Sequence, residues 1–347
     1  MKLQQLRYVW EVTRHNLNVS DTAQSLYTSQ PGISKQIRLL EDELKLEIFA
    51  RSGKHLTHVT PAGEEIVRMA GEIVRQTDSI KQLAQEYSSQ KEGRLSIATT
   101  NTQAKYALPQ VVKEFREMYP DVTLQMQQGS PEQIASLAAS GDVDFAITTE
   151  GLELFNDLIM MPCYKWNRSV VVPEGHPLTK QKEITLESLG NYPLVTYVFW
   201  ATGRSKLDEA FKNIDVTPNV VFTATDADVI KSYVKLGLGV GIVAGMAFDA
   251  VADEGLVSMD ASHLFDSSVT HIGFRRGTFL RRYMLDFIEK FAPHLDHWKV
   301  KDAVALATGK ERVEFFDSLD LPTSCLLYTS DAADEGLGVD LGGRRII

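Results

Sequence analysis

Apolar positions recur at helical spacing as far as Tyr87, and beyond Arg94 short strand-like runs alternate with helical ones. The sharpest local pattern lies in residues 19–61, which predict two short helices, a tight turn and a hairpin. Ser20 is suited to cap the first helix, a turn follows near residues 28–30, and Pro31 suits the first position of the second helix. The expected buried faces carry Ala23, Leu26 and Tyr27 in the first helix, and Ile33, Ile37, Leu40 and Leu44 in the second.

The other face of the second helix is polar and suits a groove of DNA. Serine and glutamine can read base edges there, and lysine and arginine can bind bases or phosphates. This is the layout of a helix-turn-helix, followed over residues 51–60 by a basic wing that turns at Gly53. The alternative is an ordinary helical hairpin with a solvated basic face. The predicted DNA contacts are Ser20, Thr28, Ser29, Gln30, Pro31, Ser34, Lys35, Arg38, Lys54 and His55.

Two further helices flank this segment. The first, over residues 1–15, is expected to pack on it through Leu3, Leu6, Val9, Trp10 and Leu17. A long helix begins at Thr60, the expected cap, with Pro61 in its first turn. Apolar residues alternate along it at intervals of four and three, a heptad seam that predicts pairing with a second copy of the chain. The alternative is a long helix lying on its own domain. The seam comprises Ile66, Ala70, Ile73, Thr77, Ile80, Ala84 and Tyr87.

The remainder of the chain predicts an α/β domain with a mainly parallel sheet. Helices are expected up to about Tyr119 and at 131–139, 226–236 and 280–291. Strands are expected at 95–100, 122–126, 143–148, 169–173, 194–197, 220–223, 240–243 and 268–275. Two lobes, with the chain crossing between them near 162 and 268, would leave a cleft at their junction.

Composition and charge narrow the class of protein. The chain has 347 residues, of which 44% are hydrophobic and 24% charged, as in globular proteins. The N-terminus lacks a signal pattern and no apolar run approaches the roughly 18 residues of a membrane span, so a cytoplasmic location without membrane contact is expected. Cys163 and Cys325 provide no disulfide framework and the histidines lack zinc spacing, so neither metal nor cofactor is expected.

Charge is distributed unevenly. The net charge is −10, yet residues 1–60 hold eight Lys or Arg against six Asp or Glu. A small basic N-terminal domain on an otherwise acidic protein favours specific binding to nucleic acid over nonspecific binding.

The sequence of residues 23–63 resembles the winged helix-turn-helix of LysR-type transcriptional regulators. The run A-x-x-L-x-x-S-Q-P-x-[IL]-S-x-Q-I-x-x-L-E-x-x-L-x-x-x-[LI]-F-x-R, closed by T-P-A-G, occurs here from Ala23 to Gly63. The resemblance implies a periplasmic-binding-protein-like effector domain, double-stranded promoter DNA as a partner, a homodimer or homotetramer, and contact with RNA polymerase.

Polar residues at strand ends predict a small-molecule site. Thr100, Thr102 and Gln103 stand where a strand feeds a helix, Thr149 ends another strand, and Thr202 follows a strand of the second lobe. Ligands of open α/β sheets bind beyond the carboxyl ends of the strands, and free backbone N–H groups at a helix N-terminus attract anions. Neutral donors there suit a small anion or a polar acylated amino acid. The alternative is plain helix capping.

The resemblance to the family extends to about residue 323 and is strongest to activators of cysteine biosynthesis and sulfur assimilation. Its cues are the opening MKLQQLRYVWEV, the turn at 99–103 and the motif at 198–203. It implies N-acetylserine, sulfate or thiosulfate as effectors. The implied contacts are Thr100, Thr102, Gln103, Thr149, Thr202 and, at the cleft wall, Trp166.

These inferences define the expected organisation. A DNA-binding domain over residues 1–60 is followed by a dimerisation helix and hinge over 61–92 and an effector domain over 93–323. Lobe I comprises 93–162 and 268–292, and lobe II comprises 163–267. Residues 292–323 form a polar extension with helical character. Residues 324–347 continue no pattern and are interpreted as a non-native tail.

Two other functions are compatible with an α/β chain of this length. A sulfate or small-anion solute-binding module is opposed by the missing signal pattern and by the helix-turn-helix residues. An α/β enzyme is opposed by the lack of a nucleophile or acid/base constellation. The glycines at 237–245 imitate a dinucleotide loop, but they follow a helix and precede a strand, the reverse of the required order. Cys163 has no nearby histidine in sequence and is interpreted as unreactive.

Overall fold

The computed structural model describes residues 1–53, 55–88, 93–155, 158–198, 204–306 and 308–323. The chain forms two compact units, the first comprising residues 1–90 with 277–281, and the second residues 91–276 with 282 onward. Each unit has its own buried apolar core. Within the described residues, no helix combines the length and the apolar character needed to cross a bilayer.

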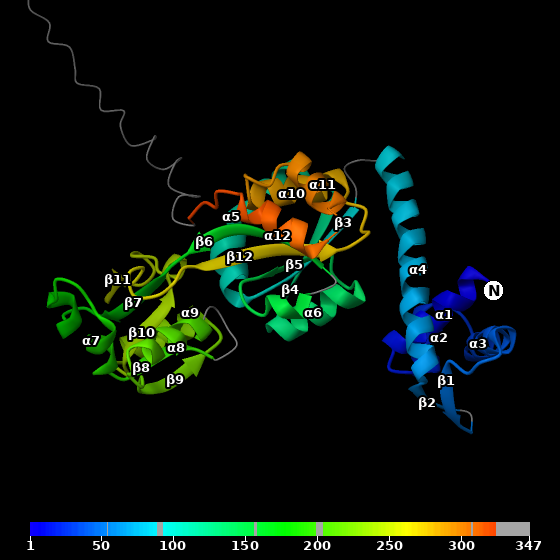
Figure 1. Ribbon diagram of the computed structural model, residues 1–347, viewed down its shortest axis with the longest axis horizontal. Helices are drawn as coiled ribbons and strands as arrows, with labels where there is room; N and C mark the ends of the chain where they lie inside the picture. Colours follow the sequence, from blue (N-terminus) through cyan, green and yellow to red (C-terminus); the bar gives the residue numbers. More distant parts are fainter. Residues whose placement is uncertain (54, 89–92, 156–157, 199–203, 307, 324–347) are drawn as a thin grey trace, which may run out of the picture. The chain divides into compact units, whose positions relative to one another are not determined.

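The first unit consists of four helices and a two-stranded antiparallel hairpin (Figure 1). The hairpin turns around Gly53, so both the helix-turn-helix and the wing are confirmed. The elements are α1 (Leu3–Arg14), α2 (Val19–Ser25), α3 (Gln30–Leu44), β1 (Phe49–Ser52), β2 (His55–Val59) and α4 (Pro61–Ser88).

The predicted apolar face of α3 lies in the core of this unit. Ile33, Ile37 and Leu40 are fully buried, and Leu44 is half-buried. The start of α4 is fixed beneath them, because the Thr60 hydroxyl accepts from the Gly63 amide at 2.9 Å and donates to the Glu47 carbonyl at 2.6 Å. A Cβ atom on Gly63 would lie 2.1 Å from the Ile48 carbonyl oxygen, so only glycine permits this approach.

Three details of the predicted helices are wrong. The cap of α2 is Asn18, whose side chain accepts from the amides of Ser20 and Asp21, so Ser20 lies inside the helix. Tyr27 is 98% exposed because its φ of 50° ends the helix and turns the ring outward. Leu3 is 46% exposed at the first residue of α1, beyond the reach of the core.

The predicted seam of α4 divides between two surfaces. Ala70 is buried and Ile66 packs against the same core cluster, so this part of the helix lies on its own unit. Ile73 and Ile80 are exposed. The helix therefore carries an inner apolar stripe against α1 and an outer stripe of Met69, Ile73, Ile80 and Leu83.

The second unit contains two α/β lobes, as predicted, but each sheet has five strands, one more than expected (Figure 1). The strands that the sequence pattern missed are Leu158–Trp166 in lobe I and Leu256–Asp260 in lobe II. In lobe I the strand order is β4-β3-β5-β12-β6. Helix α6 packs on Ala98 and Ala146 at one face, and at the other Phe145 stacks on Phe287 at 5.9 Å between ring centroids. The elements are β3 (Gly93–Thr99), the π-helix η1 (Gln103–Ala107), α5 (Leu108–Met118), β4 (Val122–Gln128), α6 (Pro131–Ser140), β5 (Phe145–Thr148), the 3-10 turn η2 (Leu152–Phe155), β6 (Leu158–Trp166), β12 (Ser268–Arg275) and α10 (Arg282–Phe291).

Lobe II has the strand order β11-β7-β10-β8-β9. Strands β8 and β10 are buried along their whole length, which explains why they are mostly apolar; the Thr196 hydroxyl of β8 donates to the Ile242 carbonyl at 3.0 Å. The elements are β7 (Arg168–Pro173), η3 (Pro177–Lys180), α7 (Leu186–Gly190), β8 (Leu194–Tyr197), α8 (Arg204–Asn213), β9 (Val220–Ala224), α9 (Ala227–Lys235), β10 (Val240–Ala244), η4 (Gly245–Ala247) and β11 (Leu256–Asp260).

The sheets are more mixed than predicted. In each lobe three neighbouring strands are parallel, but β12 and β7 are antiparallel to both of their neighbours. The reason is the crossing between lobes: β6 continues through residue 162, which was expected to be the crossing point, and the chain leaves lobe I at Asn167. At the second crossing, β12 begins at Ser268 as predicted.

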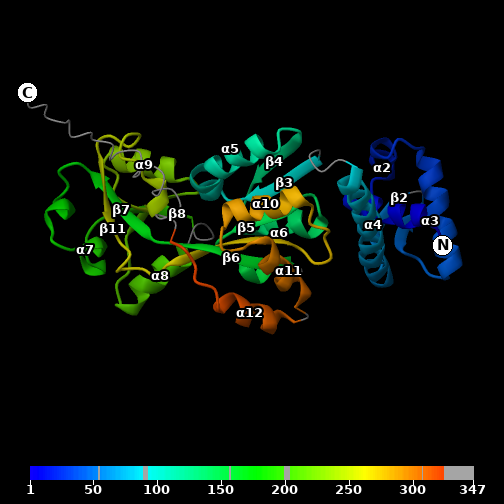
Figure 2. The ribbon, with the colours of Figure 1, turned by 90° about the horizontal axis from the view of Figure 1, so that it is seen from above.

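The extension after residue 292 is ordered as two helices, α11 (His297–Ala305) and α12 (Gly309–Asp317), shown beside lobe I in Figure 2. The chain then runs along β6, where the Lys165 amide donates to the Pro322 carbonyl at 2.8 Å. The glycines after α9 form a helix-to-strand turn as interpreted, because Gly237 adopts a φ of 79° and β10 follows. The predicted tail at 324–347 lies outside the described residues.

Candidate functional sites

The exposed surface of α3 brings most of the predicted DNA contacts together. Lys35 and Arg38 are exposed on its outer face and form no ion pair with any other described residue, so both cations are available to a polyanion. Ser34 is half-buried beside them. Thr28, Ser29, Gln30 and Pro31 are exposed around the N-terminus of the helix.

Ser29 has a second role that the sequence did not indicate. Its hydroxyl accepts from the Gly32 amide at 3.3 Å and so caps α3. His55 is exposed at the start of β2, Ser20 is exposed on α2, and Lys54 lies outside the described residues.

A buried carboxylate joins the wing to α3. The Glu41 side chain is 6% exposed, and its Oε1 atom accepts from the amides of Ile48 and Phe49 at 2.9 and 3.1 Å. Its Oε2 atom lies 2.5 Å from the Arg51 guanidinium. In the sequence, Glu41 and Arg51 stand out only as positions of the family motif. The structure shows that they form an ion pair across ten positions.

In the second unit two of the predicted effector residues, Gln103 and Thr149, contact Thr270 of β12. Gln103 in η1 donates to the Thr270 hydroxyl at 3.0 Å, and the Thr149 hydroxyl lies 3.2 Å from it. Tyr164 of β6 donates a short hydrogen bond to the other end of the Gln103 side chain. The strand-end rule selected Thr149 and Gln103, but it did not select Thr270, which contacts both, or Tyr164, which contacts Gln103. The sequence feature that could have indicated Thr270 and Tyr164 is a polar group at a buried position of a strand.

Thr102 turns toward the other lobe. It is 2% exposed, and it lies close enough to Tyr197, at the end of β8, to lower the pKa of that phenol. Burial raises the pKa of the Tyr197 phenol well above its ordinary value, although the Ala244 amide and Thr102 oppose that rise. Thr100 is half-buried directly after β3, and its carbonyl accepts from the Ala104 amide at 3.0 Å.

A buried cation that the sequence did not reveal lies beside Trp166. Arg168 is 3% exposed, donates to the Asp266 carbonyl at 3.1 Å and to the Ser268 hydroxyl at 3.2 Å, and lies 5.4 Å from the Trp166 ring centroid. Burial lowers its pKa to about 10, and the charge of Glu150 opposes that change, so the guanidinium remains charged at neutral pH. Trp166 is fully buried, and its Nε1 atom has no hydrogen-bond partner among the described residues.

Three other predictions are less directly connected to these clusters. Thr202 lies outside the described residues. Cys163 is fully buried, and burial raises the pKa of its thiol far above neutrality, in agreement with its interpretation as unreactive. Potential metal ligands gather at Asp286, Glu289 and His297, where the histidine Nε2 atom lies 2.7 Å from one carboxylate and 3.4 Å from the other, the arrangement of an ion-pair cluster.

Comparison with known families assigns both units. Residues 3–64 match the family described as "Bacterial regulatory helix-turn-helix protein, lysR family". Residues 88–296 match the family described as "LysR substrate binding domain". The second match ends before α11, so both helices of the C-terminal extension lie beyond it.

Individual relatives agree with these matches. The chain is 55% identical over 323 residues to the HTH-type transcriptional regulator CysB of Haemophilus influenzae, covering 93% of this chain and 100% of that protein. It is 47% identical to SsuR of Burkholderia cenocepacia over 86% of this chain and 97% of that protein. Among solved structures, the cofactor-binding domain of the Cbl transcriptional regulator has a TM-score of 0.60 and 41% identity, covering 62% of this chain and 95% of that one.

Proposed function

Because the chain belongs to the LysR family of DNA-binding transcriptional regulators, we propose that it controls genes of sulfur assimilation and cysteine biosynthesis in response to a small sulfur-pathway effector. The observation that carries this proposal is the 55% identity to CysB over the whole of that protein. The relatives are regulators of transcription rather than enzymes, and LysR regulators bind promoter DNA, oligomerise and respond to small molecules.

The proposed DNA reader is residues 1–60, with α3 in the major groove and the wing beside it. The free cations of Lys35 and Arg38 support this assignment, as does the position of Gln30 and Ser34 on the same helix. The proposed dimerisation helix and hinge are residues 61–92, and the outer apolar stripe of α4 supports pairing with a second copy. A tetramer would require additional contacts.

The proposed effector site lies around Gln103, Thr149 and Thr270, with Thr100 and Thr102 on the adjoining turn. Hydroxyl and amide groups from η1, from β12 and from the residue after β5 converge there, and the neighbouring buried Arg168 supplies positive potential. This donor set suits sulfate, thiosulfate or N-acetylserine. The orphaned Nε1 atom of Trp166 supports a polar ligand in the same region.

The proposed mechanism is a population shift. An effector held between two lobes stabilises one lobe arrangement, and the paired α4 helices transmit it to the spacing of the two DNA readers. The protein would act in the cytoplasm and contact RNA polymerase at its promoters. The number of effector molecules bound follows from titration rather than from sequence.

Isothermal titration calorimetry with sulfate, thiosulfate and N-acetylserine tests the effector site. Thr100→Val and Thr149→Val each remove a hydroxyl at nearly constant volume. A hydrogen bond to a charged group contributes about 1.5–3 kcal/mol, so each variant should bind its effector roughly tenfold or more weakly. Thr123→Ala is the matched control, because Thr123 is exposed near the opposite end of the same sheet.

Gel-shift titrations with fragments upstream of cysteine-biosynthesis genes test the regulatory role. We expect specific binding whose affinity or pattern changes with effector. Effector binding without specific DNA binding would favour the rival solute-binding module. Parental affinity in both threonine variants would place the effector elsewhere and leave these residues as helix caps.

A further inference from the structure

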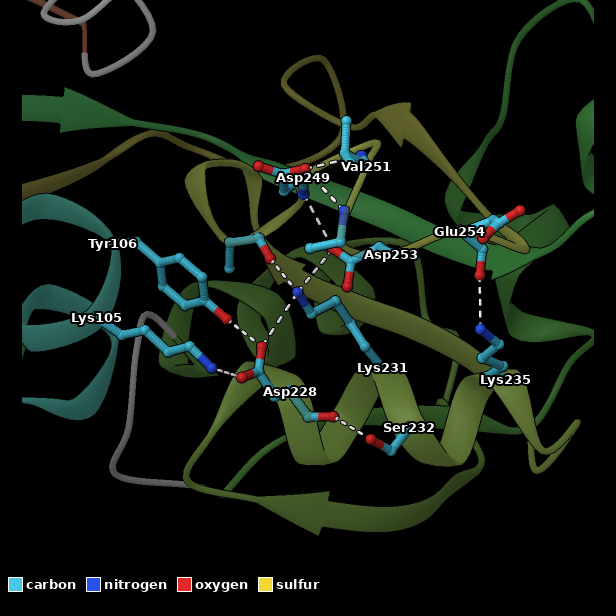
Figure 3. A network of polar contacts seen from close by, with 12 residues as sticks. Lys105, Tyr106, Asp228, Lys231, Ser232, Lys235, Asp249, Val251, Asp253 and Glu254 are labelled. Atoms are coloured by element: carbon cyan, nitrogen blue, oxygen red, sulfur yellow. Dashed lines mark hydrogen bonds and ion pairs between the residues drawn. The ribbon is translucent and has the colours of Figure 1, made fainter.

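A polar contact links the two lobes at one carboxylate (Figure 3). Tyr106 and Lys105 come from η1 of lobe I, and Asp228 lies in the first turn of α9 in lobe II. The Tyr106 hydroxyl donates to Asp228 Oδ1 at 2.5 Å, and the Lys105 ammonium forms an ion pair with Oδ2. One carboxylate of lobe II therefore receives two side chains of lobe I.

Lobe II holds this carboxylate in place. Lys231, one turn further along α9, is only 5% exposed, and its Nζ atom lies 3.2 Å from Asp228. The same atom donates to Asp253 and to the Ala247 carbonyl, both at 2.7 Å. A buried ammonium with fixed partners positions Asp228 before lobe I arrives, which reduces the entropy lost when the contact forms.

The lobes do not pack closely around this contact. A pocket of about 760 Å³ opens between them, with Pro109 and Gln110 on one wall and Ser232 and Phe248 on the other. Because this volume contains no side chains, apolar burial contributes little here. The polar contact at Asp228 therefore carries much of the attraction between the lobes on this side.

The π-helix η1 connects this contact to the proposed effector site. Gln103, at its start, binds Thr270 and Tyr164, and Tyr106, three positions later, reaches Asp228. Short π-helical turns are uncommon and occur frequently at functional sites. In so short an element, a displacement of Gln103 also moves Tyr106.

We propose that Lys105, Tyr106 and Asp228 form an interlobe latch that sets the affinity of the effector site; this inference rests on the proposed function. The latch holds lobe II against the turn of lobe I that carries the proposed effector site. Apparent affinity falls in proportion to the fraction of molecules in the binding-competent arrangement. These residues position the site and do not contact the effector.

A double-mutant cycle measured by calorimetry with sulfate and N-acetylserine tests the latch. Tyr106→Phe and Asp228→Asn should each weaken effector binding roughly tenfold, the effect expected from losing one hydrogen bond to a charged group that biases the lobes. The double variant should bind effector with the same affinity as the more impaired single variant, because both changes remove the same contact. Asp228→Asn should fold, since Lys231 keeps Asp253 and the Ala247 carbonyl, and thermal unfolding checks this.

Gln110→Ala and Lys235→Ala are the matched controls. Both residues line the same pocket, and their described hydrogen bonds remain within their own lobes, to Glu114 and to the Glu254 carbonyl. They should bind effector like the parent. Asp228→Glu, which retains the carboxylate, should recover part of the affinity lost in Asp228→Asn.

Four results would overturn the inference. Latch variants that bind like the parent, while Thr149→Val binds weakly, would refute the latch and leave the proposed effector site standing. Effects that multiply in the double variant would mean that the two residues act independently. Tighter binding by the variants would reverse the direction assigned. A parent that binds neither ligand would refute the proposed function together with the latch.

Discussion

Replacing Glu41 should unfold the DNA-binding unit more readily than any change at an exposed position of α3. The carboxylate accepts two backbone N–H groups and faces the Arg51 guanidinium, which is itself only 22% exposed. In Glu41→Ala the amides of Ile48 and Phe49 lose their acceptor, and Arg51 loses its counter-charge. Water cannot easily replace these partners, because Ile48 and Phe49 are fully buried.

The expected cost follows from these contacts. An unsatisfied buried donor costs about 1–3 kcal/mol, and breaking a buried ion pair by removing one partner costs about 3–5 kcal/mol. These two costs overlap, and the Arg51 guanidinium can partly reach water. We therefore expect Glu41→Ala to lower the free energy of unfolding by about 3–5 kcal/mol in total. A folded domain has only about 5–15 kcal/mol of stability, so the variant should lose a large share of it and melt more than about 10 °C lower.

Hydrogen exchange followed by mass spectrometry measures this in the full chain, because it reports local opening free energies for each unit separately. Peptides covering β1 and β2 should exchange much faster in Glu41→Ala, while peptides of the effector lobes should not change. Glu43→Ala is the control: it lies on the same helix, and its carboxylate pairs with the exposed N-terminal amine. Equal exchange in the two variants would refute the role given to the buried pair.

Other predictions concern the remaining surfaces. Arg38→Ala should weaken DNA binding by roughly 1–3 kcal/mol without changing the melting temperature, and parental gel-shift affinity at matched salt would mean that α3 does not face the groove. Ile73→Glu places a charge on the outer stripe of α4 and should dissociate the oligomer; an unchanged mass in analytical ultracentrifugation would contradict pairing through this stripe. Deleting residues 324–347 should leave melting temperature and effector response unchanged, and a fall of more than a few degrees would reveal structural importance. A thiol reagent should modify Cys163 only after unfolding, because the side chain is fully buried and its thiol pKa is raised.

Local signals predicted the DNA-binding unit well. The spacing of Ile33, Ile37 and Leu40 identifies one face of a helix, and Thr60 and Pro61 mark the start of another. Each of these signals spans only a few neighbouring residues. The errors arose where two local rules competed. Asn18 and Ser20 are both good caps, and the choice depends on the turn at Asn16 and Leu17, whose φ values are positive.

The candidate effector site was only half predictable, and sequence distance explains the difference. Thr100, Thr102, Gln103 and Thr149 follow from the rule that ligands bind at strand ends. Thr270 is 167 positions from Gln103, and Tyr164 is 61 positions from it. Thr270 and Tyr164 lie on the antiparallel neighbours β12 and β6. The alternation of residues within one strand does not reveal which other strand it pairs with. The latch at Asp228 is hidden for the same reason, 122 positions from Tyr106.

In the long helix α4, one predicted apolar stripe contains residues with two different structural roles. The predicted seam and its alternative were posed as competing interpretations of one apolar stripe. In the structure Ile66 and Ala70 pack in the core shared with α1 and Val74 is buried, whereas Met69, Ile73, Ile80 and Leu83 remain exposed. The two stripes lie close together around a helix of 3.6 residues per turn, so a heptad count draws residues from both. Burial within one chain separates them: the inner stripe packs the helix on its own domain, and the exposed outer stripe is the surface that we propose for pairing with a second copy. A charge at Ala70 should therefore unfold the unit, whereas a charge at Ile73 should only separate the copies.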